Sequence, residues 1–362
     1  MITVRQAGKT LIRLYARGAS SIILRRRIRC VAAPCIAPCI AACIAACLAG
    51  AVPGLALHAA AQAPWPVKPM RIIVPVVPGS FTDVVGRGLA VDMGESLGQS
   101  VLVENRPGAG TTIGAATVAK SSPDGYTLLM TENSFSIAPA LYGKQMTYDP
   151  VRDFQPVTLI AEAPTVWFSR LEFPARTPKD LVQIARSRPG EVTFATGGNG
   201  TSSHLAAELF IDRNRLKMVH VPFKGVAGSI AEIVAGRVDV GTSSIASAAG
   251  PIQAGRMRAL AVTGKERNPL LPEVTTFVEA GFGDYDMPIW FGIIAPAGLP
   301  AERLDRLHAE IVRAANRPRL RELFAAQGAR ALLVPPPAFT KRVHAEIALW
   351  REVIPRVGIR PD

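Results

Sequence analysis

The feature that most constrains the fold is an alternation of short apolar runs with helical stretches along residues 70–353. Residues 70–77 are a β-branched run typical of a buried strand, and residues 84–97 carry apolar side chains at helical spacing, with Asp83 as the predicted N-cap. Thr177 is a second predicted N-cap, because Pro178 suits the first helical position. The alternation predicts an α/β fold with a mainly parallel sheet. Further strands are predicted at 101–103, 126–130, 157–160, 165–169, 192–195, 219–222, 238–242, 259–263 and 291–295. One further helix is predicted after the turn at 106–110, up to about residue 120, and another begins at residue 177. A third follows the loop at 196–203 and runs to about residue 210. The remaining helices are predicted at 227–235, 301–316 and 337–353.

The composition is that of a folded chain, because 49% of the 362 residues are hydrophobic and 19% are charged. The length indicates two globular domains. A net charge of +13 would suit nucleic acid or an acidic membrane surface. However, residues 1–63 hold eight Lys and Arg and no acidic residue, so residues 64–362 carry only +5. With no basic stripe interleaved with aromatics in this body, we expect no nucleic-acid partner.

Residues 1–61 are predicted to be a secretory signal peptide cleaved after Ala61. A basic stretch ends at Arg29, an uncharged apolar segment follows, and small residues occupy 59–63. The alternatives are an uncleaved anchor and a lipoprotein lipidated at Cys43 or Cys47. Export predicts a periplasmic protein. All five cysteines lie in this leader, so the body has no disulfide, thiolate nucleophile or cysteine-bound zinc.

Signatures of catalysis are missing from the sequence. No metalloprotease, serine-hydrolase or P-loop motif occurs. The segment Gly108-Ala109-Gly110 opens a helix after a strand, but the next glycine, Gly114, is displaced from the dinucleotide-binding pattern. No catalytic residue, metal ligand or cofactor is therefore predicted, and an enzyme is disfavoured. Four of the five histidines are scattered along the body, with surface or capping roles expected: His204, His220, His308 and His344.

Two loops, at residues 80–83 and 197–203, have the composition of anion sites. Each joins a predicted strand to a helix start, where backbone N–H groups lack helical partners and the helix dipole is positive. Glycines let an anion approach the backbone, and Ser and Thr hydroxyls add donors. Ligands of open α/β sheets also bind at the carboxyl ends of strands. Either loop alone could be a capped turn, but two of them in two halves favour one ligand held between lobes.

At these residues the chain resembles the periplasmic substrate-binding proteins of tripartite tricarboxylate transporters, the Bug family of proteobacteria. The resemblance covers nearly all of residues 66–360 as an ordered series of short motifs. The series includes RIIVP at 71–75, VENRPGAG at 103–110, SPDGYTLL at 122–129, GNGTSSHL at 198–205, HVPFKG at 220–225, RALAVT at 258–263 and WFG at 290–292.

The resemblance implies a type II periplasmic-binding-protein fold, in which two α/β lobes joined by two crossing strands close on a ligand. It assigns residues 64–166 and 289–362 to the first lobe and residues 167–288 to the second. It implies a monomeric receptor that captures a small organic acid and delivers it to the integral-membrane permease subunits of a tripartite tricarboxylate transporter. The ligand-binding residues that it implies are Gly79, Ser80, Phe81, Thr82, Asp83, Thr131, Asn133, Thr196, Gly198, Asn199, Gly200, Thr201, Ser202, Ser243 and Ser244.

The sequence departs from the family pattern within the expected pocket. Ser80 replaces a glycine of the first loop, Phe81 replaces a small residue, and Val76 replaces an aromatic. In the second lobe, Thr242-Ser243-Ser244 replaces a Phe-Asp-Asn segment, which exchanges a carboxylate for hydroxyls. We therefore expect a carboxylate ligand with an apolar or aromatic body that contacts Phe81.

A second function stays open on the sequence alone, namely a periplasmic sensor that presents its ligand to a signalling partner. The same fold and the same cleft would serve both the transporter receptor and the sensor.

Overall fold

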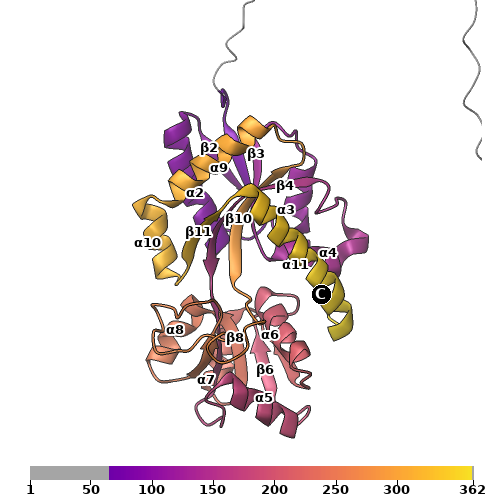
Figure 1. The fold of residues 1–362 in the computed structure, drawn as a ribbon, viewed down its shortest axis with the longest axis vertical. Helices are drawn as coiled ribbons and strands as arrows, with labels where there is room; N and C mark the ends of the chain where they lie inside the picture. Colours follow the sequence, from indigo (N-terminus) through magenta and orange to yellow (C-terminus); the bar gives the residue numbers. More distant parts are fainter. Residues whose placement is uncertain (1–64, 361–362) are drawn as a thin grey trace, which may run out of the picture. The chain divides into compact units, whose positions relative to one another are not determined.

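Two β-sheets form the framework of the protein (Figure 1), and the computed structural model describes residues 65–360. The predicted signal peptide, its cleavage site and the cysteine-rich segment lie outside the described residues. Within residues 65–360, no helix is both long and apolar enough to cross a membrane.

The first sheet combines strands from both ends of the described chain, in the order β11-β4-β10-β3-β1-β2. Strand β1 pairs in parallel with β2 and β3, whereas β10 is antiparallel to β3 and β4, and β11 is antiparallel to β4. The strands are β1 (Met70–Val74), β2 (Val101–Asn105), β3 (Thr127–Glu132), β4 (Phe154–Ala163), β10 (Ile289–Pro296) and β11 (Arg330–Val334). The helices that accompany this sheet are α2 (Phe81–Leu97), α3 (Thr112–Ala119), α4 (Ser134–Tyr142), α9 (Ala301–Ala315), α10 (Pro318–Ala326) and α11 (Pro336–Val357), with short 3₁₀ turns η1 (Ala109–Thr111) and η2 (Gly143–Gln145).

The second sheet is built from the middle of the chain, in the order β7-β6-β8-β5-β9. Strand β6 is parallel to β7 and β8, whereas β5 is antiparallel to β8 and β9. The strands are β5 (Thr165–Ser169), β6 (Thr193–Thr196), β7 (Val219–Pro222), β8 (Val240–Ser244) and β9 (Arg258–Val262). The helices are α5 (Pro178–Ser187), α6 (Ser202–Arg213), α7 (Val226–Val234) and α8 (Ile245–Gln253).

The prediction of a mainly parallel sheet is wrong, because both sheets are mixed. The reason is that the chain passes between the sheets twice. Strand β4 leads through Pro164 directly into β5, and the chain returns before β10. The passing strands β5 and β10 run against their neighbours. The lobe boundaries at 166/167 and 288/289 remain a prediction. In the structure, Thr165 and Val166 already pair with β8 of the second sheet.

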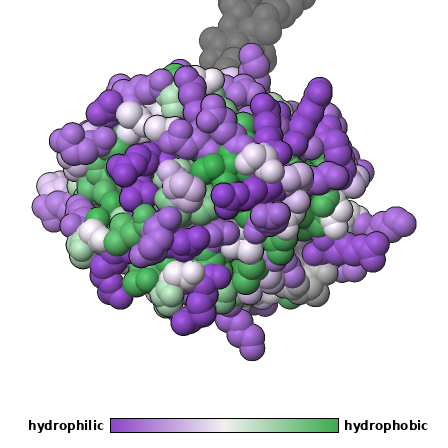
Figure 2. Space-filling model, turned by 90° about the horizontal axis from the view of Figure 1, so that it is seen from below, coloured by the Kyte–Doolittle hydropathy of each residue, from purple (hydrophilic) through white to green (hydrophobic). Residues whose placement is uncertain are grey.

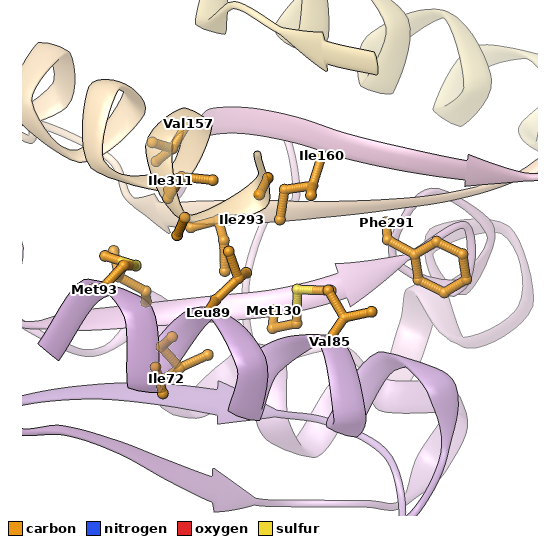
Figure 3. Close-up of a cluster of buried hydrophobic side chains, with 14 of the residues drawn as sticks. Ile72, Val85, Leu89, Met93, Met130, Val157, Ile160, Phe291, Ile293 and Ile311 are labelled. Atoms are coloured by element: carbon orange, nitrogen blue, oxygen red, sulfur yellow. The ribbon is translucent and has the colours of Figure 1, made fainter. Parts of the chain in front are cut away.

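The central strands β3, β4 and β10 of the first sheet are buried on both faces, which explains why they are largely apolar runs. Ile72, Met130 and Ile293 face one side, where they pack with Leu89 of α2 and Ile311 of α9 (Figure 3). The opposite face carries a second cluster, which includes Ile73, Leu129, Leu159, Trp290, Ile294, Phe339, Val343 and Ile347.

Helix α11 links the two cores. Its first half packs on the first sheet through Phe339. Its second half contributes Trp350 to the cluster that holds Trp167 and Phe210 of the second sheet and its α6. Beyond these cores, the end of the molecule seen in Figure 2 is mostly hydrophilic, with hydrophobic residues scattered among charged ones, which is typical of a solvated surface.

Several element ends differ from the predictions. Helix α2 begins at Phe81 with Ser80 as its N-cap, so the prediction of Asp83 as N-cap is wrong. The Ser80 hydroxyl accepts from the Asp83 N–H, which leaves Asp83 in the first helical turn. Thr177 is confirmed as the N-cap of α5 and forms a capping box with Asp180. The predicted strand 70–77 ends earlier, at Val74, and helices α4, α8 and α10 were not predicted.

Candidate functional site

The predicted ligand-binding residues collect at four strand ends, each followed by a helix. In the first sheet, β1 and β3 are parallel neighbours that lead to α2 and α4. In the second sheet, β6 and β8 are parallel neighbours that lead to α6 and α8. One contact joins the two sets, because the Ser202 hydroxyl donates to Glu132 Oε2 at 3.3 Å. The α6 start therefore lies against the end of β3.

The first loop is held by a buried carboxylate, Asp83. Its Oδ2 accepts from the Gly79 N–H at 2.9 Å and from Arg87 Nε at 3.0 Å. Its Oδ1 accepts from Asn105 Nδ2 at 2.8 Å, and the same amide nitrogen also donates to the Val76 carbonyl at 3.1 Å. Burial acts to raise the pKa of Asp83, but these hydrogen bonds outweigh it and hold the pKa below its ordinary value. All acceptor positions of Asp83 are thus directed at the loop and its neighbours.

The α2 start keeps donors available even so. The N–H of Asp83 is capped by Ser80, and the N–H of Val84 donates to the Ser80 carbonyl at 2.9 Å. Phe81 and Thr82 occupy the first two helical positions, where helix geometry provides no internal acceptor. The first loop therefore offers a ligand two N–H groups at the positive end of a helix of 17 residues.

The Phe81 ring packs within the first lobe. It meets the Phe291 ring edge-on, with centroids 4.8 Å apart, and lies 6.5 Å from the Phe324 ring of α10. Its side chain is partly exposed and borders the main core of the first sheet. The substitution of a small loop residue by Phe81 is thus accommodated by these two rings, and the contact of Phe81 with a ligand stays a prediction.

The second loop is held by hydroxyls. Thr201 is the N-cap of α6, because its Oγ1 accepts from the His204 N–H at 3.3 Å, and it also donates to the Gly198 carbonyl at 2.8 Å. The Ser203 hydroxyl accepts from the Gly197 N–H at 3.2 Å. Gly198 has a φ of +132°, which a residue with a side chain rarely adopts, so the loop conformation requires glycine there.

Two histidines lie beneath this loop, stacked face to face. The rings of His204 and His220 have centroids 3.8 Å apart and planes 9° apart. His204 Nδ1 accepts from the Gly200 N–H at 3.1 Å, so the neutral ring carries its proton on Nε2, which faces Glu208 at 3.4 Å. The expectation of surface or capping roles is wrong for His204, which is only 4% exposed.

His220 completes the support. Its Nε2 lies 2.7 Å from Thr196 Oγ1, which places the last residue of β6 in the same network. Burial, and secondarily the neighbouring His204, lower the pKa of His220 to about 4. His220 is thus a neutral ring at neutral pH. No cluster of side chains suited to a metal ion occurs among residues 65–360.

The β3 end contains one residue with a structural role and one with an unused hydroxyl. Asn133 is buried and holds the segment that returns to the first sheet, because its Oδ1 accepts from the Trp290 N–H at 2.8 Å and its Nδ2 donates to the Pro288 carbonyl at 3.3 Å. The buried Thr131 hydroxyl makes no hydrogen bond within the described residues. Thr131 is therefore better suited than Asn133 to contact a ligand.

The β8 end supplies hydroxyls, in agreement with the departure noted from the sequence. Ser243 donates to the Ser244 carbonyl at 3.0 Å, and the Ser244 hydroxyl lies 2.9 Å from that of Ser247. Ser244 stands at the N-cap position of α8 but accepts no capping hydrogen bond with its side chain. The α8 start therefore differs from the other two, because it has no side-chain cap and its first N–H, that of Ile245, donates to the Pro164 carbonyl at 3.2 Å.

Sequence reasoning missed Glu132, which lies between the predicted residues Thr131 and Asn133. Its carboxylate contacts Ser202 across the two sheets. Burial raises the pKa of Glu132 above its ordinary value, although the Ser134 backbone N–H and the Ser202 hydroxyl act in the opposite direction. Its place at a strand end, beside two predicted binding residues, was the signal that could have found it.

Two α/β sheets joined by two passing segments, with helix starts collected where the strands end, define a two-lobed solute-binding protein with the type II periplasmic-binding fold. The family model described as tripartite tricarboxylate transporter family receptor matches residues 85–359. The chain belongs to this family, which includes the Bug proteins.

Individual relatives agree with this assignment. Protein BugT of Bordetella pertussis is 32% identical over 308 residues, which cover 85% of this chain and 94% of BugT. The R. palustris protein Rpa4515, solved with adipate, is 32% identical with a TM-score of 0.67, covering 82% of this chain and 100% of its own. MatC (Rpa3494) from Rhodopseudomonas palustris, solved with bound malate, is 30% identical with a TM-score of 0.65, covering 80% and 100%.

Proposed function

We propose that this receptor captures a small organic carboxylate between its two lobes and delivers it to the permease subunits of a tripartite tricarboxylate transporter. The observation that carries the proposal is the pair of hydroxyl-capped helix starts at Ser80 and Thr201. Each follows a parallel strand and presents N–H groups at the positive end of a helix. The relatives solved with adipate and malate support a carboxylate as the ligand class.

The predicted residues divide into those that we assign to direct contact with the ligand and those that we assign to holding the loops. Direct contacts are assigned to groups with donors to spare, namely the backbone of Phe81 and Thr82, the Thr131 hydroxyl and the loop hydroxyl of Ser244. Indirect roles are assigned to side chains already engaged in holding the loops, namely Asp83, Asn133, Thr196 and Thr201. Gly198 and Gly200 allow the turn of the second loop, and Asn199 and Ser202 border it.

The test is a thermal-shift screen with a panel of organic acids. A ligand that binds only the folded state raises the unfolding temperature, and the effect grows with the logarithm of its concentration once this exceeds Kd. We expect at least one mono- or dicarboxylate to stabilise the protein. No shift with any acid of a broad panel would contradict the proposed function.

Delivery to a permease and export are further parts of the proposal. Deletion of the gene should abolish uptake of the identified ligand, whereas a sensor would change transcription and leave uptake intact. Mass spectrometry of the mature protein should give an N-terminus at Gln62, which lies in the stretch 59–63 of small residues. We also propose that the receptor is a monomer without catalytic activity, made of lobes at 64–166 with 289–362 and at 167–288.

A further inference from the structure

Glu132 places a carboxylate beside the second loop, at which an anion is proposed to bind. It is the last residue of β3, next to the buried Thr131, and Ser202 of α6 donates to it at 3.3 Å. Ser202 is also the first residue of α6, the helix that carries the anion-binding loop. The carboxylate therefore lies within one hydrogen bond of the proposed ligand site.

This carboxylate has no cationic partner in residues 65–360. The ion pairs there engage its neighbours instead: Arg342 pairs with Glu162 and Glu346, and Arg87 pairs with Asp83. Glu346 adds a further negative charge that acts on Glu132. The donors to Glu132 are neutral groups of Ser134 and Ser202, so this partly buried carboxylate lacks the opposite charge with which buried charges are normally paired.

The local chemistry conflicts with a ligand that carries negative charge alone. A second carboxylate beside Glu132 would be repelled, because like charges a few ångströms apart are destabilising in a cleft shielded from water. A ligand with a cationic nitrogen would remove the conflict, since an N⁺–H group donates to a carboxylate in a short, charge-assisted hydrogen bond. The helix starts at Ser80 and Thr201 would still hold its carboxylate end.

We propose that Glu132 determines specificity by binding a cationic nitrogen of the ligand, so that the receptor selects zwitterionic carboxylates, such as amino acids or aminoalkyl benzoates, over acids of the same shape without the amine. This inference rests on the proposed function. It adds the ligand's charge pattern and the residue that recognises it.

The experiment compares matched pairs of ligands by isothermal titration calorimetry at neutral pH. The pairs are glutarate and glutamate, butyrate and 4-aminobutyrate, and 4-methylbenzoate and 4-(aminomethyl)benzoate. The wild-type protein should bind the amine member of at least one pair about tenfold or more tightly, as expected for a charge-assisted hydrogen bond. Glu132→Gln, which keeps shape and removes charge, should bring the ratio close to one, and Glu132→Ala should do the same.

The control is Glu191→Gln, the same chemical change at an exposed carboxylate. Glu191 precedes β6, whereas the binding loop follows it, so the two lie at opposite ends of the strand. This variant should keep the wild-type ratio. Thermal melts of every variant establish that it is folded before titration.

The outcomes separate the two proposals. Binding of the acid without the amine as tightly as its partner, or a ratio unchanged in Glu132→Gln, overturns the role of Glu132 while the carboxylate receptor stands. Binding of no member of any pair, together with no response to the wider acid panel, contradicts the proposed function and this inference with it.

Discussion

The two loops proposed to bind an anion have the same plan but are held by different chemistry. Each begins a helix with a hydroxyl N-cap, Ser80 in the first lobe and Thr201 in the second. In the first lobe, the ionised carboxylate of Asp83 gathers three donors around the loop. In the second lobe, neutral hydroxyls and two stacked histidines, His204 and His220, do the same.

Because of this difference, we expect acid to destabilise the two loops at different pH values. Folding lowers the pKa of the Asp83 carboxyl below its ordinary value of 3.8. The ionised carboxylate therefore stabilises the fold at every pH above 3.8, and this stabilisation is lost only as the pH falls below that value. A histidine held neutral loses its effect sooner, because the unfolded chain takes up a proton near pH 6.5 that the folded ring accepts only near pH 4. The second loop is therefore the acid-sensitive one.

The largest effect is expected from Asp83→Ala. The change leaves the Gly79 N–H, Arg87 and Asn105 without their common acceptor, and we expect a loss of about 3 kcal/mol in the free energy of unfolding. Urea denaturation at pH 7 measures it, and ligand affinity should fall as the loop loses its position. Arg87→Ala is the control, with a smaller loss because its side chain is half exposed. A loss below about 0.5 kcal/mol for Asp83→Ala would place it among ordinary surface changes and contradict this account.

His220→Phe should have the next largest effect. Phe keeps the stack with His204 but loses the contact with Thr196 Oγ1, so we expect about 1–2 kcal/mol of destabilisation at pH 7. The difference from wild type should shrink as the pH falls from 6.5 towards 4, since only the wild-type protein loses stability by protonation of residue 220. Unfolding is measured across this range. The control is His344→Gln, a change at an exposed histidine. If the stability difference between His220→Phe and wild type stayed constant from pH 6.5 to 4, His220 would not be held neutral by the fold.

The two caps provide a direct comparison of the loops. Ser80→Ala and Thr201→Ala should each destabilise by about 1 kcal/mol, the usual effect of removing a hydroxyl N-cap. Thr201→Ala should destabilise the fold more than Ser80→Ala, because the Thr201 hydroxyl also donates to the Gly198 carbonyl. Ser80→Thr and Thr201→Ser restore the hydroxyl and should behave like wild type. Equal losses for the two alanine variants would mean that the Gly198 contact contributes nothing.

The smallest effect concerns Glu132, which joins the first lobe to the second loop. Its raised pKa means that the folded protein binds a proton more readily than the unfolded chain, so stability falls as the pH rises above about 4.5. Glu132→Gln should therefore be more stable than wild type at pH 7, by about 0.5 kcal/mol or less. This gain should vanish towards pH 4.5. A destabilised variant at pH 7 would show that Glu132 has a favourable partner in the free protein.

Much of the fold was predictable because local patterns specify it. Strand β1 followed from a β-branched run, and the start of α5 followed from Thr177 and Pro178. Helices α4 and α8 escaped prediction because Pro139 and Pro251 lie inside them, and an internal proline normally argues against a helix. The direction of the strands was not predicted correctly either, because a buried apolar run has the same sequence pattern in a parallel and an antiparallel pair.

The candidate site divides in the same way. The hydroxyl and glycine content of both loops marked them as candidate anion sites, but sequence reasoning placed the first N-cap at Asp83 instead of Ser80. The sequence could not show that Asn105 reaches Asp83, because 22 residues separate them. Nor could it show that Glu132 meets Ser202, 70 residues away.

The sequence by itself determined the class of this protein and located the two loops that we propose to bind an anion. These depend on short-range periodicity and on hydrogen bonds within one helical turn. Only the tertiary structure decided how the loops are held, which residue caps the first helix, which histidines stack, and that the Glu132 carboxylate meets Ser202. Those features depend on which strands become neighbours, and this is set by packing of the whole chain rather than by any local segment.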